Sequence, residues 1–276
     1  MSRIKLATLE QKDAILKTIY EADPIQYLFF ISDIEQFGLN SETTKTFVYE
    51  TENRFDGILM IFYNNLLIYK RDDFIFPEND IINVIEKYDI GNIIFSPNFL
   101  DTFLNMAESY KLKYKLNNEK ILSLKKDDFL KENNLNNLSS KPIEKKDLEK
   151  IVNSRRKITE FADVSAQGVQ LKYLNDSFEK GYYQGYILYD ETNKIVVSHA
   201  GTAAKIKNVA MIGGVFTLNE HRGKGYANDC VLSLCLKLLN QNITPVLFFD
   251  NPIAGKMYYK IGFKDYSELF VTKIIK

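Results

Sequence analysis

The two halves of the chain present the same order of expected helices and strands, and this repetition restricts the available folds more than any other feature. Each half begins with a helical pattern, continues with three strand-like runs, and ends with a helix, a strand, a helix and a pair of strands. Strands that cluster before a β-α-β-α tail indicate a mixed sheet and not a fully parallel one. We therefore predict an α/β fold of two similar domains, each a mostly antiparallel mixed sheet flanked by helices.

The repeat is visible at the start of each half. Leu9–Ile19 and Ile143–Val152 share an apolar residue, Glu, one variable residue, Lys and Asp ahead of a helical pattern. In each copy the Asp stands where the positive end of a helix dipole favours it. Between the halves, Lys131–Ser140 is rich in Asn and Ser and lacks apolar periodicity, which is typical of a linker. The predicted division is residues 1–127, a linker at 128–140, and residues 141–276.

The other elements follow from the spacing of apolar residues. In the first half the pattern predicts strands at 44–51, 57–63, 65–70, 92–96, 111–116 and 120–125, and helices at 77–88 and 98–110. In the second half it predicts strands at 184–190, 194–203, 209–217 and 245–250 and a strand pair within 262–275. The helices of that half are predicted at 144–157, 165–180, 223–240 and 252–261.

Charge and composition exclude several classes of protein. The 36 Lys and Arg residues balance the 36 Asp and Glu residues, and the mildly basic second half suits a small anionic ligand better than a nucleic acid. No apolar run approaches the roughly 20 residues of a membrane span, and the N-terminus lacks the apolar core of a signal peptide. Cys230 and Cys235 fall on different faces of one expected helix, so we expect reduced thiols in a cytoplasmic protein. With only two histidines, we expect no metal site.

A glycine-rich turn stands where a strand gives way to a long helix, in the stretch VFTLNEHRGKGYANDC of Val215–Cys230. The first turn of a helix offers backbone N–H groups without internal partners, and Gly223 and Gly225 remove side chains that would keep a ligand away from them. Arg222 and Lys224 add positive charge. Such a turn suits a phosphate or diphosphate, although a solvated basic turn has the same composition. The P-loop pattern is absent, and too little chain follows for a doubly wound dinucleotide fold.

A second marker lies in Asp250–Phe263, where a strand end leads through Asn-Pro into a short helix that Gly262 ends. Tyr258 and Tyr259 lie in this helix, and one of them must face the neighbouring glycine turn. Tyr259 is the expected packing residue of the two.

Together these stretches resemble the GNAT superfamily of acyl-CoA N-acyltransferases. The R-x-x-G-x-A core of the family falls on Arg222, Gly225 and Ala227. The downstream N-x-x-A-x-x-x-Y-x-x-x-G-F pattern falls on Asn251, Ala254, Tyr258, Gly262 and Phe263. The match covers residues 141–276. The first half is similar only in its element order, as a degenerate copy in a tandem-domain protein would be.

The resemblance implies a binding mode for acetyl-CoA, with its diphosphate on the glycine turn and its pantetheine arm paired with the strand before the turn. The residues implied to bind the cofactor are Val215, Phe216, Thr217, Arg222, Gly223, Lys224, Gly225, Tyr226, Ala227, Asn251 and Ala254. Gly213 and Gly214 permit a bulge that separates this strand from residues 245–250. A backbone N–H there polarises the thioester carbonyl, a neutral amine attacks directly, and Tyr258 serves the departing thiolate.

The catalytic base is the weak part of the match. Many family members carry a Glu on the strand before the turn, but Ala210 and Met211 occupy those positions here. Glu220 and His221 in the turn, and His199 on the preceding strand, are the candidates to deprotonate an ammonium through water. Surface solvation explains the first two equally well, and a hydrogen-bonded strand histidine explains the third.

The predicted function is transfer of an acetyl group from acetyl-CoA to a primary amine of a small molecule or a peptide. Glu160 and Asp163 are candidates to receive a cationic amine, although a solvated helix face also explains them. The missing strand Glu favours an alternative, a non-catalytic regulatory protein that binds acyl-CoA. A third alternative is a structural protein whose motifs are remnants. We expect a monomer or homodimer without nucleic-acid or membrane partners.

Overall fold

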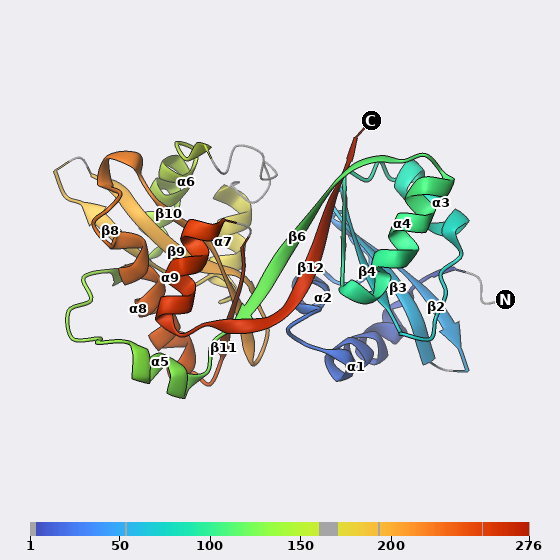
Figure 1. The fold of residues 1–276 in the computed structure, drawn as a ribbon, viewed down its shortest axis with the longest axis horizontal. Helices are drawn as coiled ribbons and strands as arrows, with labels where there is room; N and C mark the ends of the chain where they lie inside the picture. The colour runs from blue at the N-terminus through green and yellow to red at the C-terminus, as the bar shows by residue number, and fades with distance from the viewer. Residues whose placement is uncertain (1–3, 53, 160–170, 193, 250, 276) are drawn as a thin grey trace. The chain divides into compact units, whose positions relative to one another are not determined.

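The computed structural model describes residues 4–52, 54–159, 171–192, 194–249 and 251–275 (Figure 1). Contacts along the chain divide it into two compact units. Unit 1 contains residues 1–121 and 266–276, and unit 2 contains residues 122–265. Each unit is built on strands of a mixed sheet with helices packed against them, so the predicted fold class is confirmed.

Unit 1 has the strand order β1-β2-β3-β4-β5-β12, in which β4 and β5 are parallel and the other neighbours are antiparallel. The strands are β1 (Lys5–Leu6), β2 (Thr44–Thr51), β3 (Arg54–Phe62), β4 (Asn65–Lys70), β5 (Asn92–Phe95) and β12 (Lys264–Ile275). The helices are α1 (Lys12–Ala22), α2 (Leu28–Phe37), α3 (Glu78–Lys87) and α4 (Leu100–Ser109). Strand β6 (Lys113–Ser123) follows α4 and lies next to β12.

Unit 2 has the strand order β11-β10-β9-β8-β7, with β10 and β11 parallel and the other neighbours antiparallel. The strands are β7 (Lys141–Pro142), β8 (Gly185–Asp190), β9 (Ile195–Lys205), β10 (Val209–Thr217) and β11 (Thr244–Phe249). The helices are α5 (Lys126–Glu132), α6 (Leu148–Arg155), α7 (Leu171–Glu179), α8 (Tyr226–Asn240) and α9 (Pro252–Ile261).

The predicted repeat of element order is confirmed. Among the described residues of both halves, two α-helices precede a three-stranded meander, and a helix, a parallel strand and a helix follow. Each half also starts with a capping box: the N–H of Thr8 donates to Gln11 Oε1, and the N–H of Glu144 donates to Asp147 Oδ2, both at 2.9 Å. Gln11 and Asp147 therefore hold equivalent places. The sequence match, which pairs Asp13 with Asp147, is two residues out of step.

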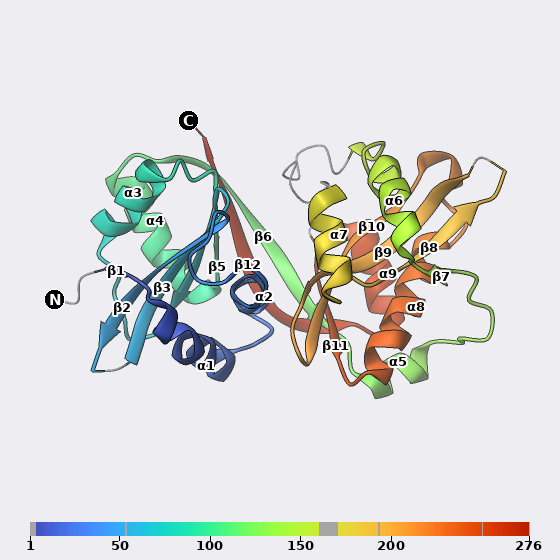
Figure 2. The ribbon, with the colours of Figure 1, turned by 180° about the vertical axis from the view of Figure 1, so that it is seen from behind.

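The strand pair predicted at the end of each half is wrong. Strands β6 and β12 are each continuous, and they lie side by side in both views (Figures 1 and 2). Asn117 and Asn118, which fall between the two strands predicted in the first half, keep extended backbone inside β6. No hairpin forms because each strand finds its partners elsewhere: β12 pairs with β5 in unit 1, and β6 leads into unit 2 beside β11.

The compact units therefore divide the chain differently from the predicted boundaries, because residues 266–276 belong to unit 1. The first residues of the predicted linker belong to α5. At the other end of the linker, two backbone N–H groups are hydrogen-bonded to α8. Ser139 and Ser140 donate these N–H groups to the carboxylate of Asp229 on α8, at 2.8 and 2.9 Å. The end of the linker is thus fixed to the first turn of α8.

Unit 2 buries two apolar clusters through different helices. Helices α8 and α9, on the near side in Figure 1, bury Leu234, Leu238, Ile261 and both cysteines against Ala210, Ile212 and Leu247. Helices α6 and α7, on the near side in Figure 2, bury Leu148, Ile151 and Leu174 against Ile187, Val197 and Phe216. The cysteines carry free thiols, as predicted. No helix within the described ranges is both long and apolar enough to cross a membrane.

Candidate functional site

The glycine turn before α8 depends on left-handed backbone. Gly223 has φ +79° and Gly225 has φ +78°, and a Cβ added at either would meet no atom within 4 Å. Conformation and not crowding therefore explains both glycines. Because this backbone is incompatible with a helix, α8 begins at Tyr226, three residues after the predicted start. Gly225 is its N-cap residue.

The first turn of α8 leaves backbone donors without a helical partner beside the exposed glycine turn. The N–H of Asp229 is the first in the helix to reach a helical acceptor, the carbonyl of Gly225, at 3.0 Å. The N–H groups before it have no partner within the helix and carry the positive end of its dipole. Arg222 and Lys224 are exposed beside them, and Nε of Arg222 donates to the carbonyl of Thr217 at 3.2 Å. This arrangement suits a bound diphosphate.

Gly225→Ala is expected to lower the free energy of unfolding by about 1 kcal/mol, because an L side chain is strained at this φ even in open space. Gly225→Asn is the matched control and should lose less, since Asn tolerates the left-handed region better. Urea unfolding measures both changes. An Ala variant as stable as the wild type would show that the turn relaxes without cost.

The predicted bulge in β10 is confirmed. The pairing between β9 and β10 shifts between Gly213 and Phe216, and Gly214 has φ +59°. On the other side of β10, the parallel pairing with β11 runs only from Val209 to Met211 among the described residues. Beyond Met211 the two strands are no longer paired, although both continue. The last part of β10 therefore has one edge without a strand partner.

Backbone directions after the bulge separate the three predicted strand residues. The N–H of Leu218 donates to Val197 of β9, and the carbonyl of Phe216 accepts the hydroxyl of Ser198 at 2.8 Å. Because successive residues of a strand point their backbone groups to opposite sides, Val215 and Thr217 point away from β9. The carbonyl of Thr217 accepts Arg222 Nε, so Val215 offers the backbone groups best placed to pair with a ligand.

Tyr258 and Tyr259 differ in how deeply they are buried. Tyr258 is 7% exposed and packs edge-on against Phe249 and Phe263, whereas Tyr259 is 42% exposed and donates its hydroxyl to Asp265. Tyr259 does pack edge-on against Phe249, as predicted, but Tyr258 makes the same contact and is the more buried of the two. The role of Tyr258 toward a thiolate stays a prediction. Burial raises the pKa of Tyr258 to about 12, so its phenol stays protonated at neutral pH.

The two remaining residues of the downstream motif lie at the start of α9. The side-chain oxygen of Asn251 accepts the N–H of Ile253 at 2.9 Å and caps the helix. Ala254 is partly buried and packs against the cluster under α8. Asn251 thus has a structural role in addition to the predicted one.

His199 is buried at 2% exposure, and both of its ring nitrogens have partners. Nδ1 lies 2.8 Å from the carbonyl of Gly214, and Nε2 lies 2.7 Å from the hydroxyl of Tyr183. A carbonyl only accepts, so Nδ1 carries the proton and Nε2 accepts from Tyr183. Burial lowers the pKa of His199 to about 4. An imidazole held in this way has no lone pair with which to take a proton from an ammonium.

The other candidates for base and acceptor residues stay predictions. Glu220 is exposed in the short turn before the glycines, and the ring of His221 stacks on that of Tyr226 with centroids 6.5 Å apart. Glu160 and Asp163 lie outside the described residues.

The residues that surround His199 could not be predicted from the sequence as its neighbours. Arg155, at the end of α6, brings Nη1 within 3.6 Å of the position that a Cβ on Gly214 would take. Tyr183 lies before β8, far from the motifs. The isolated glycines Gly185 and Gly201, inside predicted strands, were the available signal, because such glycines often mark close approach by another group.

Unit 1 differs at the corresponding places. Strands β4 and β5 pair along all four residues of β5, and the pairing of β3 with β4 has no register shift. Helix α3 follows Pro77 and has Glu78 and Asp80 in its first turn. These carboxylates occupy the positive end of the helix dipole, where they would repel a diphosphate.

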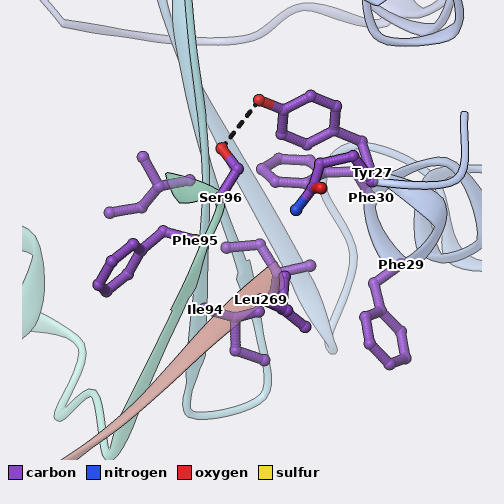
Figure 3. Close-up of a pocket in the computed structure, with 10 residues that line it drawn as sticks. Tyr27, Phe29, Phe30, Ile94, Phe95, Ser96 and Leu269 are labelled. Carbon is purple, nitrogen blue, oxygen red and sulfur yellow. Dashed lines mark hydrogen bonds between the residues drawn. The ribbon is translucent and has the colours of Figure 1, made fainter. Parts of the chain in front are cut away.

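Figure 3 shows a small cavity within unit 1. The hydroxyl groups of Tyr27 and Ser96 are hydrogen-bonded at 3.0 Å, beside Phe95 and Leu269. The cavity volume is about 10 Å³, which is room for about one water molecule and not for a substrate. Over the described parts of the chain, no group of three or more His, Cys, Asp or Glu residues is arranged to hold a metal ion.

Comparison with known proteins agrees with this geometry. A family model described as GNAT acetyltransferase matches residues 65–271, and no curated protein matches the chain. A GCN5-related N-acetyltransferase-like protein from Streptococcus suis is 14% identical, with a TM-score of 0.64, over 97% of this chain and 100% of that chain. A GNAT-family acetyltransferase from Colwellia psychrerythraea is 14% identical, with a TM-score of 0.62, over 99% and 100%. A tandem GNAT protein from the clavulanic acid biosynthesis pathway is 13% identical, with a TM-score of 0.62, over 99% and 98%. These structures share the fold of the chain, and the family model identifies it: this protein belongs to the GNAT acetyltransferase family.

Proposed function

We propose that unit 2 binds acetyl-CoA and transfers its acetyl group to the primary amine of an acceptor by direct attack. The observation that carries the proposal is the combination, in one unit, of the glycine turn before α8 with the separation of β10 from β11. The turn offers unpaired N–H groups to a diphosphate, and the separated edge of β10 offers backbone groups to an extended pantetheine arm. Either feature alone could have a purely structural role. Together they match the diphosphate and the pantetheine arm of acetyl-CoA.

The reaction needs stabilisation of charge at two atoms. As a neutral amine attacks the thioester carbon, the carbonyl oxygen gains negative charge, and an N–H of the β10 bulge is the proposed donor to it. The C–S bond then breaks, and the thiolate leaves beside Tyr258. With the pKa of Tyr258 at about 12 and that of a thiol near 8.5, full proton transfer to the thiolate is uphill by roughly 5 kcal/mol. Tyr258 is therefore proposed to act by donating a hydrogen bond.

Unit 1 is proposed to be the degenerate copy, so that one acetyl-CoA binds per chain. The proposal rests on the continuous pairing of β4 with β5 and on the acidic first turn of α3. Calorimetry with acetyl-CoA checks the stoichiometry. Two equivalent sites per chain would contradict this assignment.

Tyr258→Phe is expected to lower kcat at least about tenfold with little change in the KM for acetyl-CoA, because the hydrogen bond forms to the departing thiolate and not to the bound thioester. Thiol release from acetyl-CoA with a panel of polyamines, amino acids, aminoglycosides and peptides measures it, with mass spectrometry of the products. Tyr259→Phe is the matched control, since its hydroxyl contacts Asp265. If Tyr258→Phe equals the wild type on a substrate that turns over, the tyrosine role is wrong.

A second candidate function is a regulatory protein that binds acyl-CoA without turnover. Two observations favour it: β10 carries Ala210 and Met211 where a carboxylate base is common, and His199 has both ring nitrogens engaged. Tight binding of acetyl-CoA without thiol release on the whole panel would select it. The third reading, a structural protein with remnant motifs, predicts that CoA gives no thermal stabilisation.

A further inference from the structure

The bulge in β10 leaves Gly214 and Val215 outside the register pairing with β9. A bulged residue leaves the regular ladder, so its buried polar groups need other partners. At Gly214 that partner is a side chain, because Nδ1–H of His199 donates to the carbonyl at 2.8 Å. His199 comes from β9, the strand from which the bulge departs. One imidazole thus satisfies the group that the bulge displaces.

The imidazole is itself held by two hydrogen bonds and two ring contacts. The Tyr183 hydroxyl fixes Nε2, and the ring is close to those of Tyr183 and Phe216, with centroids at 6.1 and 5.5 Å and interplanar angles of 25° and 29°. Phe216 follows the bulge on β10, so His199 contacts β10 on both sides of Val215. Rotation of the imidazole would break two hydrogen bonds and two ring contacts together.

Glycines on two neighbouring strands make room for this side chain, and a third glycine lies beside it. A Cβ on Gly201 would lie 2.9 Å from both Cε1 and Nε2 of His199, and a Cβ on Gly185 would lie 3.3 Å from Nε2. A Cβ on Gly214 would lie 3.5 Å from Cε1. Gly185 and Gly201 are register partners on β8 and β9. The register-paired glycines of β8 and β9 therefore leave space for the buried ring, whereas a Cβ at Gly214 would be in ordinary contact with it.

The position of the bulge determines which backbone groups of β10 are free to pair with a ligand. The parallel pairing with β11 ends at Met211, and after the bulge the backbone of Val215 points to the side that β11 has left. If the carbonyl of Gly214 were released, the bulge could shift along the strand. A shift of one residue would turn the backbone of Val215 toward β9.

We propose that His199 is a positioning residue, which, oriented by Tyr183, holds the β10 bulge in the register that presents Val215 to the pantetheine arm and thioester of acetyl-CoA. This inference rests on the proposed function, and it assigns His199 a role other than that of a base. The glycine turn does not contact His199. Substitution of His199 should therefore weaken binding of the pantetheine arm and leave binding of the diphosphate unchanged.

The test compares two ligands that share the diphosphate but differ in the arm. Calorimetry measures the Kd of acetyl-CoA and of ADP for the wild type and for His199→Gln and Tyr183→Phe. His199→Gln should raise the Kd of acetyl-CoA about tenfold and leave the Kd of ADP within about twofold, and Tyr183→Phe should have a smaller effect of the same kind. Arg222→Ala should weaken both ligands.

If His199→Gln is unstable, a second pair of variants tests the same role. Tyr183→Phe removes one oxygen and keeps the ring, and Tyr186→Phe on β8 is its matched control, expected to bind both ligands as the wild type does. With His221→Gln leaving one imidazole, ¹⁵N NMR should show His199 with its proton on Nδ1. The opposite tautomer, or unchanged acetyl-CoA binding in both the His199 and Tyr183 variants, overturns the positioning role alone. A wild type that binds neither ligand overturns the proposed function and this role with it.

Discussion

Ending the chain after Asp265 should unfold unit 1 while unit 2 keeps its structure. The deletion removes the part of β12 that belongs to unit 1, including Leu269 and Phe270, which are 4% and 6% exposed. Burial of two such side chains contributes about 3–6 kcal/mol, a large part of the roughly 5–15 kcal/mol that holds a domain folded. Phe270 also stacks on Phe95 at 5.5 Å, and β5 would lose its antiparallel partner.

Hydrogen exchange measured by mass spectrometry checks this result peptide by peptide. Peptides from β3, β4 and β5 should lose protection, and peptides from α8 and β11 are the internal control. A synthetic peptide of residues 266–276 should restore protection when added in excess, because it supplies the missing strand. Phe270→Ala should cost about 3–5 kcal/mol in the intact chain. Unchanged protection of β5 after the deletion would contradict the assignment of β12 to unit 1.

Acid should destabilise the protein through His199 by roughly 3 kcal/mol between pH 6.5 and pH 4. Burial lowers the pKa of this imidazole from 6.5 to about 4 in the folded state, and each pKa unit is worth about 1.4 kcal/mol. As the pH falls through this window, the unfolded chain binds a proton that the folded chain does not. The free energy of unfolding therefore falls with pH, and the contribution is complete above pH 6.5.

Urea unfolding at several pH values measures this dependence. Other groups titrate in the same window, so the informative quantity is the difference between the wild type and His199→Gln. That difference should shrink as the pH falls, because the variant has no proton to take up at this position. His221→Gln, which removes the other histidine of the chain, is the matched control. A difference that stays constant from pH 7 to pH 4 would contradict a buried neutral imidazole.

Local patterns were sufficient to predict most of the fold. The meander strands, the helix at Pro252–Ile261 and the bulge at Gly213 and Gly214 follow from alternation, capping residues and glycine chemistry, which act over a few neighbours. The strand pairs failed for the opposite reason. Residues 113–123 and 264–275 have ordinary strand composition, and only the alternative partners, far away in sequence, decide that each remains one strand.

Within the candidate site, too, local features were predictable and contacts between distant stretches were not. The position of the glycine turn was predictable from two glycines and two cations between a strand and a helix, but the positive φ of Gly223 and Gly225 was not, since the predicted helix began at Gly223. The roles of Tyr258 and Tyr259 were not separable, since adjacent residues on a helix differ only in which face the core covers. The network of Tyr183, His199 and Gly214 joins three stretches of chain, and no single stretch contains its signal.

The place of residues 266–276 in unit 1 has a consequence for synthesis on the ribosome. Domains generally fold in the order in which they are translated. Here residues 1–121 emerge first but need residues 266–275 to complete their sheet, so we expect residues 122–265 to fold before unit 1 does. Until then β5 presents an unpaired edge, the kind of surface that chaperones protect from aggregation.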